Sequence, residues 1–245
     1  MNTNFFQNIE KSISQSRLST YKNYSSRTND KEVIINYVLN AKISENFYFL
    51  LQNLEVALRN AIYDSFKLHY PTSDFFFLFE TDSRNRYKER KEKHSRECWK
   101  MLCGVRYKLK HMQTLSDGKI IAELNFGFWT ELLISRDNKY TDMWRRIFLD
   151  VFPNYKIKSS IDKDKISIAL KIDDIRNFRN RIFHYEPIYN QSDLIKKHVD
   201  IFDILTWLNE DMKILNELFD EFKNIEENKE EIIKKLTSLT LNKEI

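Results

Sequence analysis

The sequence predicts an all-α protein built as a helical bundle. Glycine and proline occur only three times each among 245 residues, whereas sandwiches, barrels and Rossmann-type sheets need many tight turns. Apolar side chains recur at three- and four-residue steps along the chain, which is the spacing of one helix face. The apolar content of 42% argues against a disordered chain, and the length is sufficient for a sizeable core.

The first strong helical pattern covers residues 31–41 and 44–70. In its second part, apolar residues from Phe47 to Phe66 recur with helical spacing. Ser44 is placed to cap this second helix, because a serine oxygen accepts a hydrogen bond from the first turn. Pro71 ends the helix, and the aromatic stretch 72–80 is expected to form a loop or short turn that fills the core.

Further helical patterns follow along the rest of the chain. The expected helices are 84–111 with a break near Gly104, 119–134, 140–152, 161–186 and 192–225. Residues 1–30 carry no clear period and are expected to form an N-terminal arm, in which 14–24 is either a short helix or part of the arm without a helix. Residues 226–245 are expected to form a helical C-terminal extension. Because no flexible linker divides the chain, we expect a single domain over residues 1–245.

Charge is distributed unevenly along the chain. The net charge of +4 is only mildly basic and does not by itself indicate a nucleic-acid partner. The segment 84–111, in contrast, holds eleven Lys and Arg against three Glu, a local charge of +8. Aromatic residues such as Trp99 and Tyr107 interleave these charges, so the segment is a candidate track for RNA phosphates and bases. The alternative is a solvated helix whose charge faces a protein partner.

The sequence predicts a cytoplasmic protein with no membrane partner. No signal-peptide pattern is present, and the apolar run 47–54 is too short to span a bilayer. Cys98 and Cys103 are five residues apart, which fits neither a zinc ligand pair nor a redox CxxC, so reduced structural thiols are expected. No histidine shows the spacing of a metal ligand, and we expect neither a metal nor a cofactor.

The stretch "RNFRNRIFHYEPIY" (176–189) combines arginines, a histidine and aromatic residues. On a helical wheel, the apolar residues from Ile168 to Ile182 form one face that packs in the core. Arg179 falls at the border of that face, where an unpaired charge is costly, so it must reach solvent, pair with a carboxylate or meet a ligand. Arg179 and His184 lie about 140° apart on a regular helix. Either the helix is distorted before Pro187, or the motifs of two chains combine.

The simpler interpretation of this stretch is structural. Arg179 is then an ion-pair residue of the core border. His184 is a cap at the helix C-terminus, where a positive imidazole is favourable.

Three segments nevertheless resemble one protein family. "RNRIFH" (179–184) resembles the RxxxxH signature of HEPN domains (higher eukaryotes and prokaryotes nucleotide-binding). "IRNFRNRIFHYEPIY" (175–189), "FYFLLQNLEVALRNAIYDSF" (47–66) and "NFGFWTELLI" (125–134) are similar to the "RNRxxHHEPI", "LxxLExxLRNAI" and "FGFWxxLL" stretches of bacterial Abi-like (abortive-infection) proteins. The family often has a second histidine where this chain has Tyr185.

The resemblance implies a HEPN-like helical bundle and a metal-independent endoribonuclease activity. The motif arginine falls on Arg179, the following polar residue on Asn180 and the histidine on His184. A histidine moves protons at neutral pH because its unperturbed pKa is about 6.5, so His184 is expected to act as general acid or base. Arg179 would stabilise the charge on the phosphate in the transition state, and Asn180 would position the reacting groups. The 2′-OH of RNA is the nucleophile, so DNA should not be cut.

Further residues are expected to contact the substrate from the motif and the basic segment. They are Arg176, Arg181, Tyr185, Glu186, Lys100 and Arg106. Glu186 is also placed to pair with an arginine. The resemblance further implies a homodimer or higher homo-oligomer with a composite active site formed by two RxxxxH motifs.

The expected function is that of a toxin-like effector of bacterial antiphage defence, with RNA as substrate and a protein or RNA antitoxin as a possible control. A non-catalytic RNA-binding or scaffold protein of the same helical fold is the main alternative. A helical DNA-binding regulator ranks last, because no helix-turn-helix with a short glycine turn is visible.

Overall fold

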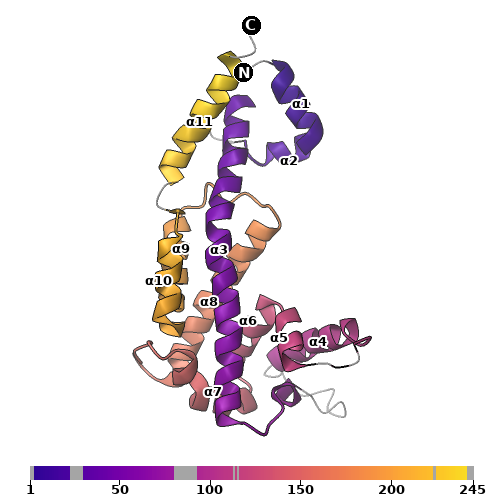
Figure 1. The fold of residues 1–245 in the computed structure, drawn as a ribbon, viewed down its shortest axis with the longest axis vertical. Coiled ribbons are helices and arrows are strands. Elements are labelled where there is room, and N and C mark those ends of the chain that lie inside the picture. The colour runs from indigo at the N-terminus through magenta and orange to yellow at the C-terminus, as the bar shows by residue number, and fades with distance from the viewer. Residues whose placement is uncertain are drawn as a thin grey trace. The chain divides into compact units, whose positions relative to one another are not determined.

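The computed structural model describes residues 3–22, 30–79, 93–112, 114, 116–222 and 225–241. Within these ranges the chain forms eleven α-helices, one 3-10 helix and no strand, so the predicted all-α fold class is confirmed. Figure 1 shows their arrangement. The elements in order are α1 (Thr3–Ile13), α2 (Gln15–Ser19), α3 (Asp30–His69), η1 (Phe75–Phe79), α4 (Lys93–Lys108), α5 (Asp117–Glu123), α6 (Phe126–Ile134), α7 (Asn138–Val151), α8 (Ile161–Phe183), α9 (Leu194–Leu208), α10 (Glu210–Leu218) and α11 (Ile225–Leu241).

Helix α3 is one continuous helix, where the sequence suggested two. Ser44 lies inside it and donates its hydroxyl to the carbonyl of Asn40 at 2.8 Å, so the predicted N-cap at Ser44 is wrong. A serine inside a helix uses its side chain in this way when no residue nearby breaks the helix. The predicted end before Pro71 is confirmed, since α3 ends at His69. Phe75 and Phe76 of η1 are buried, which confirms the predicted role of this aromatic stretch in the core.

Two predicted helices are divided by asparagine caps. Asn125 separates α5 from α6, and its side-chain oxygen accepts a hydrogen bond from the amide of Phe128 at 3.1 Å. Asn209 separates α9 from α10 and accepts from the amides of Asp211 and Met212. An asparagine side chain competes with the backbone for such bonds, which starts a new helix without glycine or proline. The opposite error occurs at Gly104, where α4 continues without the predicted break.

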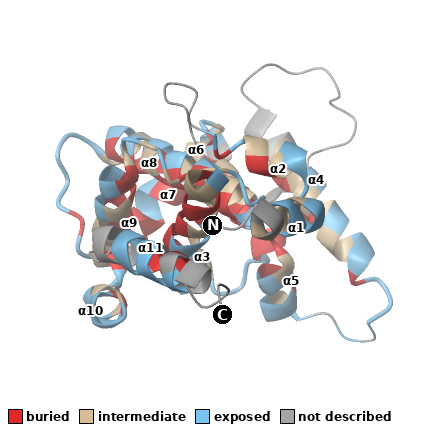
Figure 2. Ribbon diagram, turned by 90° about the horizontal axis from the view of Figure 1, so that it is seen from above, coloured by how far each residue is buried: buried red, intermediate tan, exposed pale blue. Residues whose placement is uncertain are grey.

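The chain divides into two compact units. Unit 1 comprises Met1–Leu51, Phe178–His198 and Asn216–Ile245, and unit 2 comprises Gln52–Asn177 and Val199–Leu215. In unit 2, the largest buried side chains include Trp129 of α6 and Trp144 of α7. The indole nitrogen of Trp144 donates to the carbonyl of Leu132 at 3.1 Å, so this large ring is buried with its polar group satisfied. Figure 2 shows buried residues on both α6 and α7.

In unit 1, α1 and α2 lie on one side of the N-terminal half of α3 and α11 on the other (Figures 1 and 2). Phe47 of α3 packs edge-on against Phe178 and Phe222, with ring centroids 4.8 and 4.9 Å apart. His198 stacks on Phe222, and its Nε2 lies 2.8 Å from a carboxylate oxygen of Asp220. These contacts join α3, α8, α9 and the segment after α10 into the core of unit 1.

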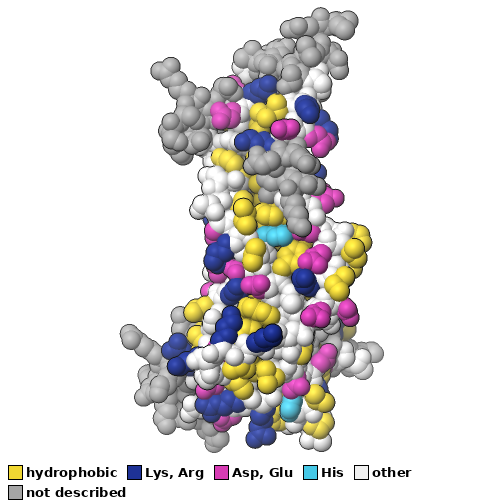
Figure 3. Space-filling view, turned by 90° about the vertical axis from the view of Figure 1, so that its left-hand side faces the viewer, with side chains coloured by type: hydrophobic (Ala, Val, Ile, Leu, Met, Phe, Trp, Pro, Cys, Tyr) yellow, Lys and Arg dark blue, Asp and Glu magenta, His cyan; other side chains and the backbone are white. Residues whose placement is uncertain are grey.

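The surface carries charges of both signs mixed with hydrophobic side chains, as Figure 3 shows for one face. Among the exposed hydrophobic residues are Ile214 and Leu218 of α10. Among the described residues, no helix is both long and apolar enough to cross a membrane.

Candidate functional site

The predicted core face of α8 is confirmed. The apolar residues from Ile168 to Ile182 that the wheel placed on one face are all at most 5% exposed, including Ile175 and Phe178. At the N-terminal end of the helix, a carboxylate oxygen of Asp164 accepts hydrogen bonds from the amides of Lys158 and Ser159, which holds the preceding loop. The helix that carries the motif is therefore fixed by its buried side.

Helix α8 ends inside the motif, one residue before His184. The amide of Tyr185 donates to the carbonyl of Ile182 at 2.9 Å, and the amide of Glu186 donates to that of Arg181 at 2.8 Å. This pair of bonds is the Schellman ending of a helix, whose αL position is usually a glycine. Here Tyr185 occupies the αL position with φ of 58°. Tyr185 is also 75% exposed, so burial of its ring does not explain this conformation. A bulky residue in this conformation is strained, and such strain is frequent at functional sites.

The loop after the motif is held by Asn40 of α3. The Asn40 side chain is buried, and its oxygen accepts from the amides of Ile188 at 2.6 Å and Tyr189 at 3.2 Å. Its amide nitrogen donates to the carbonyl of Glu186 and to the hydroxyl of Tyr21, both at 3.3 Å. One buried amide thus fixes the end of α8 against α3.

Arg181 braces the same loop from the motif side. Its Nε donates to the Glu186 carboxylate at 3.2 Å, and its Nη2 donates to the carbonyl of Pro187 at 2.6 Å. The predicted pairing of Glu186 with an arginine is therefore confirmed. In this structure the Arg181 side chain contacts the loop backbone at Pro187, and the Glu186 carboxylate holds the Arg181 guanidinium.

Arg179 and Asn180 lie half-buried on the last turns of α8. The Arg179 guanidinium carbon lies 4.0 Å from the ring centroid of Phe183, and its Nη1 donates to the Asn180 side-chain oxygen at 3.4 Å. Phe183 in turn stacks on Tyr48 of α3, with centroids 5.5 Å apart and planes 25° from parallel. A cation held on an aromatic face is an arrangement for Arg179 that the helical wheel did not suggest.

His184 is exposed and makes no side-chain hydrogen bond with any other residue in the described part of the chain. It lines a cavity of about 850 Å³ that lies wholly within unit 1. Among the other lining residues are Arg17, Tyr21, Tyr37, Tyr48 and Tyr185. Arg179 and Asn180 are not among them, although Phe183, against which the Arg179 guanidinium packs, is a lining residue.

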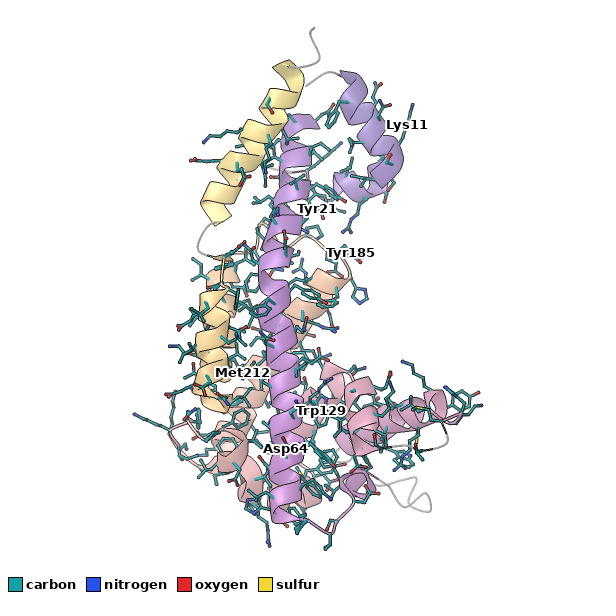
Figure 4. The ribbon with its side chains drawn as sticks, viewed as in Figure 1. Lys11, Tyr21, Asp64, Trp129, Tyr185 and Met212 are labelled. Atoms are coloured by element: carbon teal, nitrogen blue, oxygen red, sulfur yellow. The ribbon has the colours of Figure 1, made fainter. Side chains whose placement is uncertain are left out.

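Figure 4 shows Tyr21 and Tyr185 on the same side of α3, near α2 and at the end of α8 respectively. Burial raises the pKa of Tyr21 above its ordinary value of 10.0, although the Arg17 guanidinium opposes the shift. The Tyr21 phenol is therefore neutral at neutral pH. It also stacks on Tyr189, with centroids 5.8 Å apart, which fixes this wall of the cavity to the loop after the motif.

The remaining predicted contact residues lie in unit 2. Arg176 pairs with Asp173 through Nε at 2.9 Å and Nη2 at 2.6 Å. On α4, Lys100 pairs with Glu97 at 2.9 Å, and the Arg106 guanidinium lies 6.0 Å from the ring centroid of Trp99. Residues 84–92 of the predicted basic track lie outside the described residues.

Sequence reasoning missed the cavity residues Arg17, Tyr37 and Tyr48. Arg17 belongs to the segment that was expected to be a short helix or an arm, and Tyr37 and Tyr48 lie within the helical pattern of α3. The only sign of these residues in the sequence is an arginine in a polar segment and two tyrosines in a helical pattern. They come together in one cavity through tertiary packing, which their spacing does not reveal.

Among the described residues, no three His, Cys, Asp or Glu side chains gather in a way that could hold a metal ion. Comparisons with protein-family models, with curated proteins and with solved structures found no match.

Proposed function

We propose that this protein is a metal-independent endoribonuclease of the HEPN type that acts as a toxin-like effector in antiphage defence. The proposal rests on the resemblance of three segments to Abi-like proteins, and on the accessible position of His184 beside a cavity large enough for a nucleotide. The expected control is an antitoxin or a phage trigger, because an active ribonuclease harms its own host.

The proposed reaction is attack of the ribose 2′-OH on the adjacent phosphate. The hydroxyl loses its proton, the phosphorus–oxygen bond to the 5′-oxygen breaks, and that oxygen leaves with a proton. The products are a 2′,3′-cyclic phosphate and a 5′-hydroxyl. His184 exchanges protons as general acid or base, a contribution that is typically worth about 10²–10⁴-fold in rate.

Arg179 and Asn180 are assigned to the charge on the phosphate. A guanidinium offers fixed paired donors to phosphate oxygens, which a lysine does not. In one chain the Arg179 guanidinium rests on Phe183, whereas His184 lines the cavity. We therefore propose that two chains pair, so that Arg179 of one motif and His184 of the other act on the same phosphate.

The single structural observation that carries the proposal is the imidazole of His184. It is exposed, lines a cavity and makes no hydrogen bond with any other described side chain or backbone group, which leaves both ring nitrogens accessible to a substrate. The test is cleavage of mixed RNA with EDTA present by wild type, His184→Ala and Arg179→Ala. We expect cleavage by wild type and a loss of at least about 10²-fold in each folded variant. Cleavage that survives His184→Ala would contradict the site.

A second candidate function is a non-catalytic RNA-binding or scaffold protein. The half-buried packing of Arg179 against Phe183 favours it, because a stacked guanidinium is also a stable structural arrangement. RNA binding by wild type without any cleavage, in the presence and absence of added divalent metal ions, would support this second candidate.

A further inference from the structure

The cavity beside His184 combines three elements of unit 1. The N-terminal arm contributes Arg17 and Tyr21, α3 contributes Tyr37 and Tyr48, and the end of α8 contributes His184 and Tyr185. Its volume of about 850 Å³ falls within the range of about 300–1,000 Å³ typical of small-molecule sites. The arm, which has no part in the RxxxxH motif, is therefore a wall of the cavity that the motif histidine faces.

Two aromatic rings of the cavity are accessible to a ligand. Tyr48 is 50% exposed, and its ring is backed by stacking on Phe183. Tyr185 is 75% exposed, and the Schellman bonds fix its backbone beside His184. Rings of this kind are the platforms on which unpaired bases stack, with a contribution of about 1–3 kcal/mol per base.

Charge in the cavity is suited to a phosphate on the arm side. Arg17 is half-buried, its guanidinium lies 5.8 Å from the Tyr21 ring centroid, and it forms no ion pair with a carboxylate in the described part of the chain. Glu45 is the one acidic residue among the described lining residues, and it already pairs with Lys42 at 2.7 Å. A guanidinium beside aromatic faces matches the alternation of phosphate and base in a nucleic acid.

We propose that this cavity binds one unpaired nucleotide of single-stranded RNA next to the phosphate that is cut. The base stacks on Tyr48 and Tyr185, and Arg17 contacts a backbone phosphate. The inference rests on the proposed function, since it places the nucleotide relative to His184. It adds that the substrate is single-stranded and that the N-terminal arm takes part in binding it.

Binding is measured by fluorescence anisotropy with a short labelled single-stranded RNA whose sugars are 2′-O-methylated, so that it lacks the nucleophile and stays intact with the wild-type protein. We expect Tyr48→Leu to weaken binding about 5- to 100-fold, and Tyr48→Phe to restore it. Tyr185→Asn should weaken binding without a loss of helix content, because asparagine tolerates the αL backbone conformation. Phe219→Leu, an exposed aromatic outside the cavity, is the matched control and should have no effect.

The arm is tested through the salt dependence of the same binding. Arg17→Gln should lower the slope of log K against log salt concentration by about 0.7, the value for one phosphate contact to a single strand. Lys11→Gln is the control, because Lys11 is exposed on the same arm and does not line the cavity. Equal slopes for wild type and Arg17→Gln, together with unchanged affinity in Tyr48→Leu and Tyr185→Asn, would overturn the inference.

Two further experiments distinguish this inference from a mononucleotide site and from the proposed ribonuclease function itself. Free nucleoside monophosphates that bind more tightly than the RNA through the same residues would make the cavity a mononucleotide site and overturn the RNA assignment. Cleavage is assayed separately with unmodified RNA. Cleavage that is unaffected by the Tyr48 and Arg17 substitutions would leave the proposed function and overturn the cavity. Binding through Tyr48 and Arg17 without cleavage would support the cavity and reject the ribonuclease.

Discussion

Asn40 offers the sharpest test of how the motif is positioned. Its buried side chain makes four hydrogen bonds, to the backbone of Glu186, Ile188 and Tyr189 and to the hydroxyl of Tyr21. Asn40→Ala removes all four and leaves the buried amide of Ile188 without its acceptor. Each bond contributes about 0.5–1.5 kcal/mol, and an unsatisfied buried group costs about 1–3 kcal/mol. Because such contributions are not fully additive, we expect a loss of about 2–4 kcal/mol.

Hydrogen exchange at the amides of Ile188 and Tyr189 is the most direct assay, because it reports opening of this loop rather than unfolding of the whole chain. A loss of about 2–4 kcal/mol accelerates their exchange by about 30- to 700-fold. Asn46→Ala is the control on the same helix, since Asn46 makes one long bond of 3.5 Å to the carbonyl of Glu221. Equal exchange in Asn40→Ala and Asn46→Ala would refute the assigned role of Asn40.

Three other predictions follow from particular residues. Tyr185→Gly should raise the free energy of unfolding by about 0.5–1 kcal/mol in urea denaturation, because glycine adopts φ of 58° without strain, whereas Tyr185→Ala should not. Burial lowers the pKa of Lys165 from 10.5 to about 8. Between these pH values the unfolded lysine still holds its proton, so the free energy of unfolding should rise with pH by up to about 3 kcal/mol, and Lys165→Met should lack this rise. Finally, mixing inactive Arg179→Ala and His184→Ala chains should restore about a quarter of wild-type cleavage if two chains form one site, and no recovery would contradict a composite site.

The sequence indicated the fold class and the buried face of α8 because both depend on local periodicity. The end of α3 before Pro71 and the burial of Phe75 follow in the same way from local chemistry. The divisions at Asn125 and Asn209 were missed, because an asparagine is tolerated within a helix or starts one according to which amides it meets. Ser44 was wrongly predicted to start a helix. A serine is likewise tolerated within a helix, where its hydroxyl can bond to a carbonyl of the preceding turn.

The candidate site was only partly predictable. His184 was identified from its motif, but its cavity depends on how the arm and α3 pack, which no spacing in the sequence encodes. Arg179 was correctly placed at the border of the core, and its position on Phe183 requires the ring orientation that Tyr48 sets. Long-range contacts of this kind decide which of the predicted residues share a site.

We propose that this protein cuts RNA by attack of the 2′-OH, with His184 as a proton-transfer group. The most direct measurement uses an RNA whose cut position has been mapped, compared with the same RNA carrying a single 2′-deoxy sugar at that position. We expect a 2′,3′-cyclic phosphate end from the first RNA, no cut at that position in the second, and no cut of either by His184→Ala. Cleavage at the 2′-deoxy position, or cleavage by His184→Ala at the wild-type rate, would contradict it.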